Sequence, residues 1–263
     1  MKRPLTAAAL SVLFISCIAA SSAVLDPSPH RPQPEAPAPA KAANHPATDH
    51  HIDPDKITAE TQKDLPGKDS LGFVWWIPHE FWRASLAQEQ GITPEMIDGL
   101  VDSLSNYTIV MVVDGTMDAD GGPSFVAESA LRDALTLVDP KGTVHSPLDN
   151  SKINATTRAM FNQMKPLLAA SAGEMGRSMH VFYFPGKHED GSPVVDPRSD
   201  GMLQVKVNER AVKFRLPLGS LMPEKVCPTC AESLNGAWKF CPWDGAALKP
   251  APAPDAPAAG APK

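Results

Sequence analysis

Apolar and polar residues alternate along two neighbouring segments in the second half of the chain, and this alternation predicts a β-hairpin. Residues 203–207 read LQVKV and residues 212–216 read VKFRL, with a polar turn at 208–210 between them. Because successive side chains of a strand point to opposite faces, each of these strands has one face toward a core and one toward water.

Other segments predict further strands. GFVWWI at 72–77 is apolar at every position after the glycine, which is typical of a central strand covered on both faces. YTIVMVV at 107–113 and MHVFYF at 179–184 are rich in β-branched and aromatic residues, as strands are. Short apolar segments at 136–138 and 143–145 flank DPKG, a turn sequence, and predict a second hairpin.

Apolar residues at helical spacing predict helices between these strands. One helix is expected over 78–88, and a second begins after Thr93, a good N-cap. Asn154 can cap a third helix, in which Pro166 predicts a kink and Gly173 a frayed end. Strands joined by hairpins, with helices in blocks, indicate an α+β fold on a mainly antiparallel sheet. A β-sandwich with inserted helices is the alternative topology.

The N-terminal residues predict export. Residues 1–23 contain a short basic start, an apolar stretch and small residues near the end, which is typical of a signal peptide. The apolar stretch is shorter than the about 20 residues that a membrane-spanning helix needs. We therefore expect a periplasmic or extracellular protein. Two alternatives stay open: a lipoprotein attached through Cys17, and an uncleaved membrane anchor.

Composition divides the remaining chain into four parts. Residues 24–64 are rich in Pro, Ala and His, and they predict a disordered linker because they contain few large apolar residues. Residues 65–222 are predicted to form the α+β domain and residues 223–249 a small separate module. Residues 250–263 are a second Pro/Ala segment and predict a disordered tail. The four histidines of the linker are interpreted as polar filler, because a disordered segment fixes no ligand geometry.

Two similar segments near the C-terminus carry the most specific chemistry in the sequence. CPTC at 227–230 and CPWD at 241–244 are separated by ten residues. Zinc needs about four ligands in a tetrahedron, and thiolates and carboxylates both qualify. The two segments supply four candidate metal ligands: Cys227, Cys230, Cys241 and Asp244.

The CPxC and FCPxxG patterns from Cys227 to Gly245 resemble the zinc-ribbon family, in which two short turns each present a pair of ligands. The resemblance implies a structural zinc ion, with Asp244 where the family has a fourth cysteine and Ala231 where it often has glycine. The segment between the turns contains Asn235-Gly236, which predicts a two-residue hairpin turn. Zinc ribbons usually serve as structural or docking modules, so the resemblance also implies a protein partner.

Other states of the cysteines stay open at this point. An exported protein meets an oxidising compartment, where one disulfide and one free thiol could form. Three free thiols are the remaining state. A thioredoxin-like redox motif is disfavoured, because CPTC does not stand at the start of a βαβ unit.

Charge and motifs limit the possible functions. The formal net charge is -6 and no run of basic residues is present, which disfavours nucleic-acid binding. Common nucleotide-binding, hydrolase and metalloprotease signatures are missing from the sequence. The sequence therefore predicts an exported, non-catalytic binding or structural protein, which would contact a membrane only if anchored or lipidated. The alternative is an extracytoplasmic hydrolase that uses Ser70, His180 or His188. His145 is interpreted as a hydrogen-bonded strand residue and His188 as a loop residue.

Overall fold

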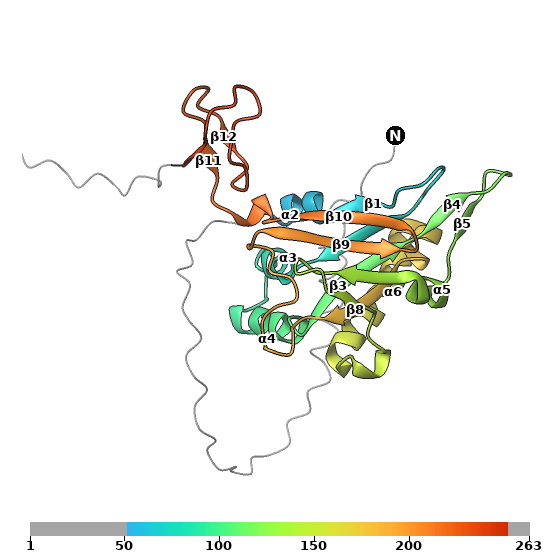
Figure 1. Ribbon diagram of the computed structural model, residues 1–263. Coiled ribbons are helices and arrows are strands. Elements are labelled where there is room, and N and C mark those ends of the chain that lie inside the picture. Colours follow the sequence, from blue (N-terminus) through green and yellow to red (C-terminus); the bar gives the residue numbers. More distant parts are fainter. Residues whose placement is uncertain (1–51, 252–263) are drawn as a thin grey trace, which may run out of the picture.

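The computed structural model describes residues 52–251 (Figure 1), so the predicted signal peptide and Cys17 lie outside the described residues. Within them the chain forms five α-helices, and its strands form four sheets. Every pairing between these strands is antiparallel. The predicted α+β class with a mainly antiparallel sheet is confirmed. Among these residues no helix is both long enough and apolar enough to cross a membrane.

The first sheet is built around a strand that is buried on both faces. Its order is β1 (Gln62–Asp64), β2 (Phe73–Ile77), β3 (Tyr107–Val113) and β8 (His180–Pro185). All five residues of β2 are buried, as the sequence predicts. The Trp75 ring packs edge-on against Phe81, with ring centroids 5.1 Å apart. The neighbouring Trp76 ring lies 5.9 Å from that of Phe214, in the second sheet. Adjacent side chains of β2 therefore pack against different layers.

The second sheet contains both predicted hairpins. Its order is β10 (Arg210–Leu216), β9 (Gly201–Val207), β6 (Leu135–Val138) and β7 (Val144–His145). In β9 the side chains of Leu203, Val205 and Val207 are buried, and the residues between them are at least partly exposed. One face of this sheet therefore covers β2, and the other faces water. The two sheets pack as a sandwich, which is the topology that the sequence left as an alternative.

Helices cover the other face of the first sheet. They are α2 (Pro54–Thr61), α3 (His79–Leu86), α4 (Pro94–Leu104) and α6 (Ala155–Arg177). The remaining helix, α5 (Glu128–Ala134), contacts β9 and lies on the side of the second sheet, where Arg132 stacks over the ring of Phe182. The predicted N-caps are confirmed, because Thr93 accepts a hydrogen bond from the Met96 amide and Asn154 accepts one from the Thr157 amide. Pro166 lies inside α6 and keeps helical φ and ψ. The residue of α6 that departs from helical geometry is Gly173, with φ 59° and ψ −128°.

The C-terminal boundary of the predicted linker needs correction. Residues 54–64 form α2 and β1 and do not continue the linker. Asp53 caps α2 by accepting a hydrogen bond from the Asp55 amide, and the side chain of Ile57 is fully buried. A short helix can pack on an existing core with one capping residue and one buried apolar side chain. Two such residues hardly change the average composition of a long segment, so composition does not reveal this helix. The rest of the predicted linker, up to residue 51, lies outside the described residues.

A small three-stranded sheet follows the main domain, at the end where α2 lies (Figure 1). Its order is β12 (Ser233–Leu234), β11 (Lys225–Val226) and β13 (Lys249–Pro250). Glu60 of α2 joins this module, residues 223–249, to the domain. Its carboxylate accepts hydrogen bonds from the amides of Gly219 and Ser220, each at 3.0 Å, and from the side chain of Asn235 at 3.2 Å. The module is thus attached through a specific polar contact.

Candidate metal centre

The structure brings the four predicted ligands together in residues 223–249. One ligand atom from each of Cys227, Cys230, Cys241 and Asp244 lies within 4.8 Å of the others, so the cluster could hold a metal ion. The sulfurs of Cys230 and Cys241 are 3.9 Å apart. Two sulfurs bonded at about 2.3 Å to one tetrahedral ion lie about 3.8 Å apart. The observed spacing therefore needs little adjustment to bind an ion.

The first pair of ligands is held by a tight turn. The Ala231 amide donates to the Cys227 carbonyl at 3.0 Å, and the Cys227 amide donates to the Glu232 carbonyl at 3.0 Å. The amides of Thr229 and Cys230 point at the Cys227 sulfur, at 3.4 and 3.5 Å. Ala231 closes the turn with φ 62°, a left-handed conformation that favours glycine. The turn thus holds an alanine in a conformation that glycine adopts more easily.

The second pair is held by the same hydrogen-bond pattern. The Gly245 amide donates to the Cys241 carbonyl at 3.0 Å, and the Cys241 amide donates to the Ala246 carbonyl at 2.8 Å. Gly245 has φ 73°, so it corresponds to Ala231. Asp244 thus occupies the place of Cys230 in the first turn. One of its oxygens accepts from the Ala246 amide at 2.8 Å, and the other lies 3.2 Å from the Cys227 sulfur.

The predicted hairpin turn at Asn235-Gly236 is wrong. Strand β12 pairs with β11 around the first turn, which contains Cys227 and Cys230. Neither residue has the positive φ that two-residue hairpin turns require. The Asn235 side chain accepts from the Ala237 amide at 2.9 Å, and a Cβ on Gly236 would lie 2.2 Å from the Pro223 carbonyl oxygen. The small residue is needed for close packing of the module on the preceding segment, which local sequence does not reveal.

The thiols influence one another electrostatically. Burial raises the pKa of Cys227, but the amides of Cys230 and Thr229 donate to its sulfur, and the net effect lowers this pKa. At Cys230 the Glu232 amide lowers the pKa, whereas burial and the thiols of Cys227 and Cys241 raise it to about 11. Three thiolates and one carboxylate in so small a volume would repel one another. A divalent cation is the complementary partner for such a set.

The three cysteines of the described segment, 52–251, are free thiols. The distance between the sulfurs of Cys230 and Cys241, 3.9 Å, is far longer than a disulfide bond of about 2.05 Å. The disulfide alternative is therefore not the state that the structure contains.

A second cluster was not predicted from the sequence. Asp139, His145 and His188 also place one ligand atom each within 4.8 Å of one another. Asp139 and His145 belong to the β6–β7 hairpin, and His188 belongs to the loop that follows β8. An Asp and a His in one short hairpin are a weak local signal. The third residue joins them through the tertiary fold alone.

The residues proposed for a hydrolase do not form one group. Ser70 accepts a hydrogen bond from the Gly72 amide at 3.2 Å. His180 lies 3.5 Å from a carboxylate oxygen of Glu128. His188 belongs to the cluster with Asp139 described above. These contacts give no support to an active site that combines the three.

Comparison of the chain with protein-family models, with curated proteins and with solved structures finds no match. The residue pattern and the geometry of the two turns therefore support the resemblance to zinc ribbons. What the protein does must be argued from the same observations.

Replacing Ala231 by Gly should stabilise the C-terminal module. Glycine adopts the left-handed conformation of Ala231 without strain, which should raise the free energy of unfolding by about 1–2 kcal/mol. Glycine also has more conformational freedom in the unfolded chain, which lowers the free energy of unfolding by about 0.4–1 kcal/mol. We expect a net gain of about 0.5–1 kcal/mol, seen in titrations as two- to fivefold tighter metal binding. Ala246→Gly is the matched control, since Ala246 has no positive φ. An Ala231→Gly variant that binds metal no better than wild type contradicts this expectation.

Proposed function

We propose that residues 223–249 form a structural zinc ribbon and that the protein is a non-catalytic binding or structural protein. The observation that carries this proposal is the pair of equivalent turns, which direct three sulfurs and one carboxylate toward one point. Zinc accepts this ligand set, and four protein ligands complete a tetrahedron. Such a closed site leaves no position for a substrate, so it serves folding.

The ribbon needs an ion because it lacks an apolar core. Its strands are two residues long. Of residues 223–249, all described by the structure, Cys227 and Cys241 are the only ones in the buried hydrophobic set. Small modules bury too little surface to fold alone, and metal binding then supplies the missing free energy. The two buried side chains at the centre of the module, Cys227 and Cys241, are thus themselves proposed ligands.

Substitution of Asp244 tests the zinc site directly. Asp244→Cys restores a fourth thiolate and should tighten zinc binding more than tenfold, and Asp244→Ala removes a ligand and should weaken it more than tenfold. Calorimetric titration with zinc measures both changes. Asp200→Ala, which removes an exposed carboxylate outside the ribbon, should leave the affinity unchanged.

The thiol state provides an independent check of the same site. Peptide mapping should find Cys227, Cys230 and Cys241 as thiols, and bound cobalt should show thiolate-to-metal charge-transfer absorption that Cys241→Ser abolishes. A disulfide among these cysteines, or cobalt binding without thiolate absorption, would overturn the zinc-ribbon proposal.

Three exposed aromatic side chains of the ribbon are its proposed docking residues. Trp238, Phe240 and Trp243 are 44%, 62% and 74% exposed. The Trp243 indole nitrogen donates to the Glu232 carboxylate at 2.7 Å, which orients this ring. Exposed aromatic residues are enriched at protein interfaces because they bury much apolar area and lose little entropy. These side chains therefore fit a protein partner with apolar pockets.

The double variant Phe240→Ser, Trp243→Ser should lose this partner and keep its metal. Cross-linking in the native host, followed by mass spectrometry, should recover a partner with the wild type and less than a tenth as much with the variant. Met117→Ser, which changes an exposed apolar residue of the main domain, is the control. Equal recovery from the double variant would argue against docking through the ribbon.

Export is the second part of the proposal, and it rests on the sequence of residues 1–23. In a Gram-negative host the mature protein should be found in the periplasm with Val24 at its N-terminus, as N-terminal sequencing can show. Leu13→Arg, which interrupts the apolar stretch, should keep the protein in the cytoplasm. A product that is lipidated at Cys17 would support the lipoprotein alternative, and a cytoplasmic wild-type protein that begins at Met1 would refute export.

A further inference from the structure

The open edges of the two sheets meet on one side of the sandwich. Strand β7 is the edge of the second sheet and β8 is the edge of the first. The Leu148 amide, just after β7, donates to the Tyr183 carbonyl of β8 at 2.7 Å and ties the edges together. The β6–β7 turn and the loop after β8 therefore lie side by side. Asp139, His145 and His188 come from these two segments.

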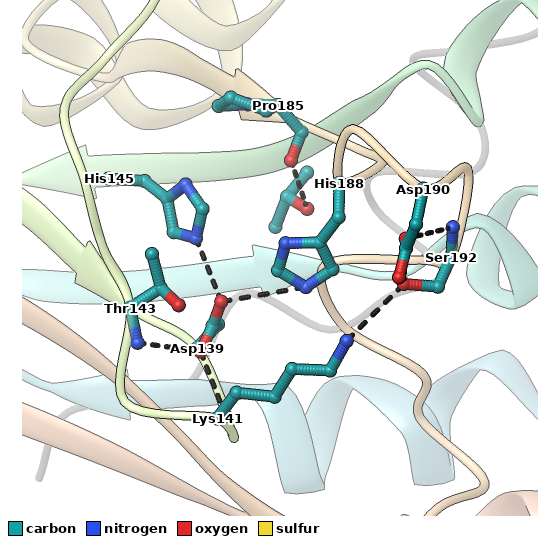
Figure 2. Close-up of polar contacts among 9 residues, drawn as sticks. Asp139, Lys141, Thr143, His145, Pro185, His188, Asp190 and Ser192 are labelled. Atoms are coloured by element: carbon teal, nitrogen blue, oxygen red, sulfur yellow. Dashed lines mark hydrogen bonds and ion pairs between the residues drawn. The ribbon is translucent and has the colours of Figure 1, made fainter.

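Asp139 is a buried carboxylate with a fixed orientation. Its side chain is 0% exposed, and one oxygen accepts hydrogen bonds from the amides of Lys141 and Thr143, at 2.8 and 2.9 Å. The other oxygen faces two imidazoles (Figure 2). It lies 2.9 Å from Nε2 of His145 and 3.6 Å from Nε2 of His188. The turn thus provides hydrogen bonds for one oxygen of Asp139 and directs the other oxygen at the two histidines.

The loop that carries His188 is itself well held. The His188 amide donates to the Ser192 carbonyl at 2.8 Å, and the Gly191 amide donates to the His188 carbonyl at 3.0 Å. Gly191 closes the turn with φ 80°. Lys141 reaches across from the other segment and donates to the Ser192 hydroxyl at 3.3 Å (Figure 2). The three side chains therefore meet in a site that is formed before any ligand binds.

One polar atom in this site has no hydrogen bond. Nε2 of His188 is buried, and the structure gives it no hydrogen bond. A buried nitrogen without a partner costs free energy, and native proteins rarely contain one without a reason. The nearest group is the Asp139 oxygen that already binds His145. A cation between the three side chains would satisfy all of them at once.

We propose that Asp139, His145 and His188 bind a divalent transition-metal ion in the main domain. Ligand atoms bonded at about 2.0–2.2 Å to one ion lie about 2.9 Å apart at right angles and about 3.5 Å apart in a tetrahedron. The two spacings in the structure, 2.9 and 3.6 Å, lie close to these values. Imidazole and carboxylate suit zinc, iron and nickel. Three protein ligands leave a coordination position for water or an external anion.

This site is independent of the ribbon, so each can fail without the other. The full-length chain with His45, His50 and His51 replaced by Gln is the background, because those imidazoles could bind metal without a built site. This protein should bind two equivalents of zinc in calorimetric titration. His188→Ala and His145→Ala should each remove one equivalent and leave the thiolate absorption of cobalt intact. Cys241→Ser should remove the other equivalent together with that absorption.

His180→Ala is the matched control, because His180 is another largely buried histidine whose ring contacts Glu128 and no residue of this site. It should still bind two equivalents. If His188→Ala does not fold, nuclear magnetic resonance of the background chain, in which His145 and His188 are both present, answers the same question through its histidine ring signals. Zinc should then shift the rings of His145 and His188 and leave those of His79 and His180 unchanged.

The proposal is overturned if only the thiolate equivalent of zinc binds, or if His188→Ala and His145→Ala bind as much zinc as their background. It is equally overturned if zinc leaves the ring signals of His145 and His188 unchanged. In any of these outcomes the cluster is an internal hydrogen-bonded group of one carboxylate and two imidazoles.

Discussion

The architecture depends on one strand that cannot face water. Strand β2 is buried at all five positions, so both of its faces need a covering layer. Trp75 packs against the helices and Trp76 packs against the second sheet, so each of these two layers must present an apolar surface to β2. The hairpins of the second sheet supply one apolar face for this purpose and leave the other in water. The meeting of β7 with β8, and with it the Asp139 cluster, follows from that stacking.

The C-terminal module obeys a different constraint. It has no apolar layer, and its two fully enclosed hydrophobic residues are cysteines of the candidate metal centre. Its backbone is organised by two turns with matching hydrogen bonds, and the hydrogen bond from Asn235 to Glu60 attaches it to the domain. Hydrophobic burial thus holds the domain, and polar contacts together with the proposed ion hold the module. Removing an ion should therefore affect the module and leave the domain folded.

Local patterns were enough to predict features that depend on neighbours in sequence. The β9–β10 hairpin follows from alternation, and the grouping of Cys227, Cys230, Cys241 and Asp244 follows from two turns of equal length. Prediction failed where the decisive contact comes from elsewhere in the chain. Asn235-Gly236 packs against Pro223, α2 docks on the core through Ile57, and His188 meets Asp139 only because two sheet edges adjoin. None of these contacts leaves a periodic signal in the sequence.

The two candidate metal sites differ in what an ion would do in each. In the ribbon the ligands have no other core to hold them, so most of the binding free energy would be used in folding and the ion would be retained. Around Asp139 the hydrogen bonds of Lys141 and Thr143 and the loop of His188 hold the ligands without any ion. Binding there would cost little ordering, and a free coordination position would remain. An ion at this second site could therefore exchange, or bind an external ligand, while the fold stays unchanged. If the protein has chemistry beyond structure, the edge between β7 and β8 is where the described residues provide for it.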